Sequence, residues 1–378
     1  MEYFPLGLAE GKAFCNRAQE RKKLQSNIEL SRSTIVTSPR RYGKSSLVLY
    51  VLKELQIPYE RVDLFVTLDE STVAKEIING VNNLINKIIT KPEQLIASMK
   101  EILKNVNTKW LIGTDGITVE LSRKNNQDDA LAIRDSLIIL NRILEKKEKR
   151  AVFFIDEFQE IGVIANAKGI EGAIRHVAEK TKNLSFVFSG SNRHVLESVF
   201  NDRSRPLYML CDKIVLERIS EEDYVNFINK IAQKKWGGPL SSTLYRELFA
   251  LTELHPYYIN LVCGRLYVES TTSPTQKDVT TIWKKYLTEE KTKTAIDLSK
   301  LSLIQKKLLI FIAHGQKTGL TSKESVRKMA TTSGSVIKAL KVLIAKDYLY
   351  EDKNSEYGIV DPLIASSIKH FFLSDELI

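Results

Sequence analysis

The first group of residues suited to chemistry in this chain lies at 38–46, where the sequence reads SPRRYGKSS. A β-branched run precedes this stretch and apolar residues at helical spacing follow it, so the order is strand, glycine-containing turn and helix. That order is typical of a phosphate-binding loop, whose backbone N–H groups and helix N-terminus point at phosphate oxygens. Gly43 allows a conformation that a side chain would obstruct, and Lys44 places a positive charge beside the β- and γ-phosphates. The hydroxyl of Ser45 is then a predicted ligand for Mg²⁺.

One position of this loop departs from the pattern. Ser38 stands where a phosphate-binding loop has its first glycine. Serine is small, and Pro39 stiffens the next step of the backbone. We therefore expect the loop to close, with some strain or an altered affinity for nucleotide.

A second signal is a pair of carboxylates, Asp156 and Glu157, directly after the apolar run at residues 151–155. A continuous apolar run of this length is typical of a parallel strand buried on both faces, and open α/β sheets bind ligands at the carboxyl ends of such strands. Asp156 is the predicted partner of Mg²⁺, and Glu157 is the predicted group that polarises an attacking water. The alternative is a strand that merely ends in a polar turn.

A third apolar run, residues 184–188, ends in the small polar residues of the sequence SGSN. Ser191 or Asn192 could hydrogen-bond a γ-phosphate or the attacking water, which would make either of them a catalytic residue. For each of these residues, a plain turn after a strand fits the pattern equally well.

Taken in order, these stretches resemble a known family, the archaeal-type ATPases of the STAND/AAA+ group, which are akin to origin-recognition initiator ATPases. The resemblance rests on seven stretches spread over nearly the whole chain: residues 14–24, 38–47, 153–161, 189–196, 203–228, 251–263 and 357–372. It implies an α/β fold, with a parallel-sheet P-loop NTPase core, a helical lid and a C-terminal winged-helix domain. It further implies Arg17 beside the adenine and a His255-Pro256 turn that approaches the nucleotide. The implied nucleotide-binding residues are Arg17, Ser38, Pro39, Arg40, Arg41, Tyr42, Gly43, Lys44, Ser45, Ser46, His255 and Pro256.

The expected domains are an ATPase core at 1–216, a lid at 217–295 and a winged helix at 296–378. The last range reads as three helices followed by two short strands around a polar turn, which is the winged variant of the helix-turn-helix. Double-stranded DNA could meet its third helix and its wing at Ser333, Ser335, Lys338, Lys341 and Lys353. However, the third helix has none of the arginine, asparagine or glutamine residues that usually read base edges, so a protein partner remains an alternative.

The composition adds only broad limits. In 378 residues, 43% are hydrophobic and 27% are charged, so the chain has room for two or three globular domains. With no long apolar stretch and no leader pattern, we expect a cytoplasmic protein with no membrane partner. The three cysteines lie far apart and the five histidines show no metal-ligand spacing, so no disulfide framework or zinc site is predicted. The formal charge of +10 permits an acidic partner without requiring one.

The sequence therefore favours a slow Mg²⁺-dependent ATPase that acts as a regulatory switch and moves its winged helix with nucleotide state. The alternatives are a nucleotide-bound scaffold that does not hydrolyse, and a P-loop phosphotransferase. The adjacent Glu157 and the C-terminal domain argue against the phosphotransferase. Oligomeric state stays open, since Arg193, Arg203 or Arg205 could reach a neighbouring copy's γ-phosphate or act within its own chain.

Overall fold

The structure is a computed structural model that describes residues 2–67, 69–89, 109–113, 116–120, 129–164 and 167–371; the side chains of 109–120 and of Val163 lie outside the description. The chain divides into two compact units, one of Arg17–Glu217 and one that joins Met1–Asn16 to Arg218–Ile378. The ATPase core was expected at residues 1–216, and the unit found in the structure begins instead at Arg17. Residues 1–16 group with the C-terminal unit because Phe4 joins a hydrophobic cluster formed by the helices that follow Arg218.

The Arg17–Glu217 unit is built on a parallel five-stranded sheet with the order β2-β5-β6-β1-β7, which confirms the predicted α/β class. Its strands are β1 (Thr34–Thr37), β2 (Tyr59–Asp63), β5 (Ala151–Asp156), β6 (Leu184–Gly190) and β7 (Asp212–Val215). β1, β5 and β6 are buried along their whole length, as the β-branched run of β1 and the mainly apolar runs of β5 and β6 predict.

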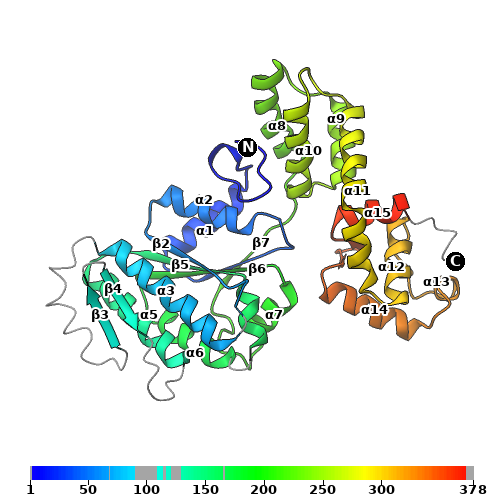
Figure 1. The fold of residues 1–378 in the computed structure, drawn as a ribbon. Coiled ribbons are helices and arrows are strands. Elements are labelled where there is room, and N and C mark those ends of the chain that lie inside the picture. The colour runs from blue at the N-terminus through cyan, green and yellow to red at the C-terminus, as the bar shows by residue number, and fades with distance from the viewer. Residues whose placement is uncertain are drawn as a thin grey trace. The chain divides into compact units, whose positions relative to one another are not determined.

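Helices cover both faces of this sheet (Figure 1). On one face lie α1 (Ala18–Glu29) and α2 (Lys44–Leu55); on the other lie α3 (Glu70–Ile88), α5 (Asp129–Lys146) and α6 (Ala167–Ala178). The short elements η3 (Phe158–Val163) and α7 (Arg193–Asn201) follow β5 and β6, and β3 (Lys109–Gly113) pairs with β4 (Gly116–Glu120) as a separate antiparallel hairpin. Phe158, Phe188 and Phe200 pack ring to ring inside this core.

The second unit holds two hydrophobic clusters. The first is formed mainly by α8 (Glu221–Trp236), α9 (Ser242–Thr252), α10 (Pro256–Glu269) and α11 (Gln276–Ser299), with the N-terminal segment that contains η1 (Gly11–Ala13). The second is formed by α12 (Leu303–Ala313), α13 (Lys323–Lys328), α14 (Ser333–Ala345), β8 (Leu349–Glu351), β9 (Tyr357–Ile359) and α15 (Pro362–Phe371). Three helices followed by an antiparallel hairpin give the element order of a winged helix.

Two features tie these clusters together within the unit. α11 runs without a break across the boundary expected after residue 295 and ends at Ser299. Tyr258 of α10 donates a hydrogen bond of 2.6 Å to the carboxylate of Asp361, which precedes α15. Among the described residues, none of the helices combines the length and apolar character that crossing a bilayer requires.

Candidate nucleotide site

The predicted phosphate-binding loop leaves β1 at Thr37 and leads into α2 at Lys44. Gly43 is the N-cap of this helix and has φ 88°, a left-handed conformation that glycine adopts without steric cost. Arg41 is also left-handed, with φ 65°, whereas Ser38 is not among the residues with positive φ. Serine therefore replaces the usual glycine at a position that does not require left-handed backbone, and the local backbone strain lies at Arg41 instead.

Lys44 lies beneath the loop with only 5% of its surface exposed. Its ammonium donates hydrogen bonds to the backbone oxygens of Ser38 (3.2 Å) and Pro39 (3.3 Å). A buried ammonium at the N-terminus of α2 adds its charge to the positive end of the helix dipole, which is the electrostatic requirement of a phosphate site.

Arg17 supports the loop from α1. It is 7% exposed, and its guanidinium donates to the backbone oxygen of Tyr42 (3.3 Å) and to the carboxylate of Glu20 (3.0 Å). The resemblance placed Arg17 beside the adenine, and the contacts found in the structure are with the backbone of the phosphate-binding loop. Of the other loop residues, Tyr42 and Ser46 are buried, while Arg40 and Arg41 are exposed.

Asp156 lies at the carboxyl end of β5 and is 1% exposed. Its Oδ2 accepts a hydrogen bond of 2.6 Å from the hydroxyl of Ser45, so the two predicted Mg²⁺ ligands are adjacent although 111 residues separate them. Its Oδ1 accepts from the hydroxyl of Ser189 and from the backbone N–H of Glu157. A hydroxyl and a carboxylate are hard oxygen ligands of the kind that Mg²⁺ takes in proteins, so the residues present fit this ion.

One further side chain contacts Asp156, and we did not predict it. Arg61 of β2 donates to Oδ2 of Asp156 from Nε (3.1 Å) and from Nη2 (2.8 Å), and Nη2 also contacts the carboxylate of Asp63 at 2.9 Å. A signal was present in the sequence, since Arg61 and Asp63 are two residues apart and therefore share one face of a strand. The sequence did not indicate that β2 pairs with β5, and it is this pairing that places Asp63 opposite Asp156.

Glu157 adopts the left-handed backbone conformation, with φ 53°, immediately after the strand. Its Oε2 accepts hydrogen bonds from the hydroxyl of Ser191 (2.9 Å), from the backbone N–H of Ser191 (3.3 Å) and from the amide of Gln159 (2.6 Å). Ser191 also accepts a bond of 3.4 Å from Arg40 of the loop. Asn192 has a different position in this arrangement, because its side chain caps α7 by accepting from the N–H of Val195.

Gln159 is therefore a second side chain that contacts the predicted catalytic residues and that we did not single out. It is 5% exposed and packs against Gly190 at the end of β6. A Cβ at residue 190 would lie 2.1 Å from Oε1 of Gln159, so only glycine leaves room for this amide. The amide in turn fixes the direction of the Glu157 carboxylate.

Other predicted residues lie elsewhere. His255 belongs to the second unit, where its Nδ1 accepts a hydrogen bond from the N–H of Tyr257 and caps α10, with Pro256 as the first helical residue. The proximity of these two residues to a nucleotide stays a prediction. Arg205 makes a two-pronged ion pair with Glu171, which is wholly buried on α6, so its guanidinium is engaged within the core. Arg203 is exposed.

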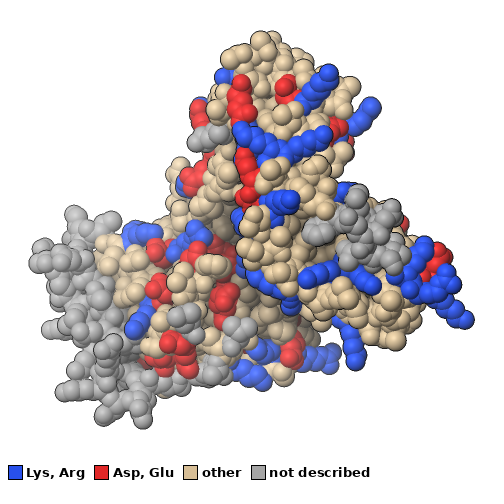
Figure 2. Space-filling view, turned by 45° about the vertical axis from the view of Figure 1, so that its right-hand side comes forward, with Lys and Arg blue, Asp and Glu red and all other residues tan. Residues whose placement is uncertain are grey.

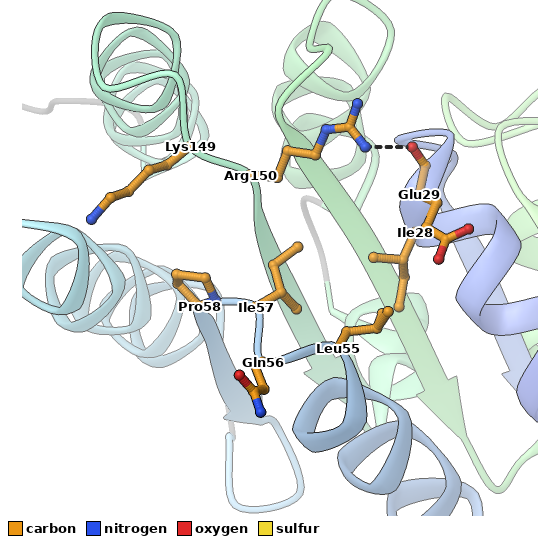
Figure 3. A pocket seen from close by; sticks show the side chains of 8 residues that line it. All are labelled: Ile28, Glu29, Leu55, Gln56, Ile57, Pro58, Lys149 and Arg150. Carbon is orange, nitrogen blue, oxygen red and sulfur yellow. Dashed lines mark hydrogen bonds between the residues drawn. The ribbon is translucent and has the colours of Figure 1, made fainter.

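A hollow of about 360 Å³ lies in the same unit, and Figure 3 shows its lining. Two lining residues are the last residues of helices: Glu29 ends α1 and Leu55 ends α2. Two others directly precede strands: Pro58 lies before β2 and Arg150 before β5. Arg150 donates a bond of 2.7 Å to the backbone oxygen of Glu29 across its rim. Because it lies where these strands begin, the hollow is at the opposite edge of the sheet from Asp156.

The predicted DNA-contacting residues of α14 and the wing differ in their surroundings. Lys338, Lys341 and Lys353 are exposed. The hydroxyls of Ser333 and Ser335 bond locally, to the Thr321 backbone oxygen at 3.3 Å and to the Thr332 hydroxyl at 3.0 Å.

The exposed face of α14 also carries Ile337 and Val342, at 45% and 38% exposure. Basic side chains are prominent over the C-terminal helices in the view of Figure 2. The face thus offers positive charge and aliphatic surface together.

Comparison with known proteins shows what this fold is similar to. No family profile matches the sequence, and no curated protein matches it. Among solved structures, a Walker-type ATPase of Pyrococcus abyssi is 18% identical with a TM-score of 0.70, over 97% of this chain and 99% of that one. The ORC2 protein of Aeropyrum pernix is 13% identical with a TM-score of 0.55, over 94% of each chain. At this level of identity the similarity establishes the fold alone, which this chain shares with both structures over nearly its whole length.

Proposed function

We propose that the protein binds ATP with Mg²⁺ at the carboxyl edge of its sheet and hydrolyses it slowly, as a regulatory switch. The observation that carries this proposal is the meeting of three separate segments. The hydroxyl of Ser45 lies 2.6 Å from Asp156, and the neighbouring Glu157 is oriented by Ser191. A phosphate-binding loop, a metal-ligand pair and an oriented carboxylate are the parts that nucleotide hydrolysis needs.

The roles follow from position and chemistry. Lys44 and the N–H groups that open α2 would bind the phosphates, and Ser45 with Asp156 would hold Mg²⁺. When bound, the ion would supply charge neutralisation for the phosphates. Glu157 would accept a proton from the attacking water. The hydrogen bonds from Gln159 and Ser191 would fix the orientation of the Glu157 carboxylate.

A switch also needs an element that responds to nucleotide. In this chain β7 ends at Val215 and α8 begins at Glu221, so a short connection leads from the sheet into the helical unit. We propose that nucleotide state moves the helical unit through this connection and repositions the winged-helix domain, which would dock on DNA or on a protein. The ORC2 structure of Aeropyrum pernix is described as ADPNP–ADP complexes, which supports nucleotide binding by this fold.

A second candidate is a nucleotide-bound scaffold that does not hydrolyse. It is favoured by the hydrogen bonds of Glu157, because Oε2 already accepts three of them and a proton from water would have to go to Oε1.

The test is steady-state phosphate release from ATP with Mg²⁺, comparing the wild type with Glu157→Gln, each with and without duplex DNA. We expect Glu157→Gln to lose about 100-fold or more in turnover, since general-base catalysis contributes on that scale, while ATP binding is retained. Lys44→Ala serves as the control that loses binding itself. No phosphate release by the wild type above that of Glu157→Gln and Lys44→Ala, with or without DNA, would leave the scaffold as the function. Stimulation by DNA would identify the winged helix as a nucleic-acid contact.

A further inference from the structure

The guanidinium of Arg61 binds the oxygen of Asp156 that Mg²⁺ would need as a ligand. Oδ2 of Asp156 receives Nε and Nη2 of Arg61 at 3.1 and 2.8 Å, and the hydroxyl of Ser45 at 2.6 Å. The side chain of Asp156 is 2% exposed, so its charge requires a compensating cation inside the protein. The structure gives this task to Arg61.

The same arginine already has a second partner. Its Nη2 lies 2.9 Å from Asp63, which is 47% exposed and follows Arg61 on the same face of β2. Arg61 itself is 30% exposed, so its guanidinium can move towards Asp63 without crossing packed core. The two carboxylates differ in solvent access, and only the buried one adjoins Ser45.

We propose that Arg61 competes with Mg²⁺ for Asp156, transfers to Asp63 when the metal binds, and thereby sets the Mg²⁺ concentration at which the nucleotide site loads. This inference rests on the proposed function. The physical reason is that two cations held close to one carboxylate oxygen repel each other, and Oδ2 of Asp156 already accepts three hydrogen bonds. Arg61 would keep the buried carboxylate neutralised between rounds of metal release and binding.

The experiment uses the full chain and a Mg²⁺ titration of binding to a fluorescent, non-hydrolysable ATP analogue. We expect Arg61→Gln to lower the Mg²⁺ midpoint by about tenfold, which corresponds to the loss of one charge-assisted contact. Arg61→Lys keeps the charge but loses the two-pronged geometry. Its Mg²⁺ midpoint should therefore lie between those of the wild type and Arg61→Gln. Asp63→Asn should raise the midpoint, because the arginine then has no second carboxylate to pair with.

The matched control is Asp63→Asn in the Arg61→Gln background. If Asp63 acts through Arg61, its effect on the midpoint should largely vanish there, whereas a purely local effect of its charge would persist. Melting without metal or nucleotide gives a second readout: Arg61→Gln should lower the melting temperature of the wild type but not that of Asp156→Asn.

The outcomes separate the two proposals. A wild type that binds no nucleotide at saturating Mg²⁺ overturns the proposed function, and this inference with it. A wild type that binds normally, with the same Mg²⁺ midpoint in Arg61→Gln, overturns only the competition. A lowered midpoint in Arg61→Gln, together with the disappearance of the Asp63→Asn effect in that background, supports it.

Discussion

The ion pair between Arg205 and Glu171 gives a prediction that separates a structural arginine from a catalytic one. Arg205 donates from Nε to Glu171 at 3.1 Å and makes a second contact through Nη2. The Glu171 side chain is wholly buried and that of Arg205 is 15% exposed. Burial raises the pKa of Glu171 above its usual range, although Arg205 and Lys168 both act to lower it. The perturbation is Arg205→Met, which removes the counter-ion and leaves the buried carboxyl.

The magnitude follows from burial. Removing one partner of a buried pair leaves an uncompensated charge and costs about 3–5 kcal/mol, whereas replacing both partners with apolar residues is often near neutral. We therefore expect Arg205→Met to destabilise the core by that amount, and Arg205→Met with Glu171→Met to recover most of the loss. Each kcal/mol corresponds to roughly 2–4 °C in the melting temperature of a unit of this size.

The pH dependence has a definite sign. Without Arg205, the folded pKa of Glu171 rises further above its unfolded value, because the group that lowered it is gone. A carboxyl with a raised folded pKa favours the folded state at low pH and loses that contribution as pH rises through the folded pKa. The stability deficit of Arg205→Met should thus be smaller near pH 5 than at pH 8.

The assay is urea unfolding at both pH values, followed by hydrogen exchange of peptides from β5 and β6, so that the core is read separately from the helical unit. ATP turnover per folded molecule should stay near that of the wild type. An arginine that stabilises a transferring phosphoryl group contributes about 10³-fold or more to turnover. A loss of that size with unchanged exchange rates would refute this reasoning and make Arg205 an arginine finger.

Two further predictions concern Gly190, which lies behind the amide that bonds Glu157, and the lysines of α14. In Gly190→Ala the added methyl would lie 2.1 Å from Oε1 of Gln159 and 2.8 Å from Cδ1 of Leu196, so the amide has to shift and we expect its bond to Glu157 to break. Turnover should fall about tenfold with ATP affinity retained, since one hydrogen bond to a charged group is lost, and full activity would contradict the role given to Gln159. For Lys338→Ala and Lys341→Ala, DNA affinity measured against salt concentration should show a slope reduced by roughly one for each lysine. An unchanged slope would instead indicate a protein partner for this face.

Much of the site could be predicted because its signals are local. A β-branched run, a glycine turn and a helical spacing lie side by side in sequence, and the strands β5 and β6, which end at Asp156 and Gly190, are mainly apolar runs. Such strands must be central, because no other setting buries both faces, and central parallel strands bring their carboxyl ends to one edge. The neighbourhood of Ser45, Asp156 and Glu157 follows from these two facts.

The remaining contacts were decided by tertiary structure. Arg61 reaches Asp156 because β2 pairs with β5 in a register that places Asp63 opposite Asp156, and the sequence of a half-buried strand does not specify its neighbour or its register. Gln159 reaches Glu157 because Gly190, on a different strand, leaves room for its amide. Residues 1–16 join the C-terminal unit because Phe4 finds its apolar partners there, more than 200 residues along the chain. By itself, the sequence determined which groups lie at the edge of the sheet, because burial and strand polarity follow from local pattern. Which of them touch depends on pairing between distant segments, and only the packed structure determines that.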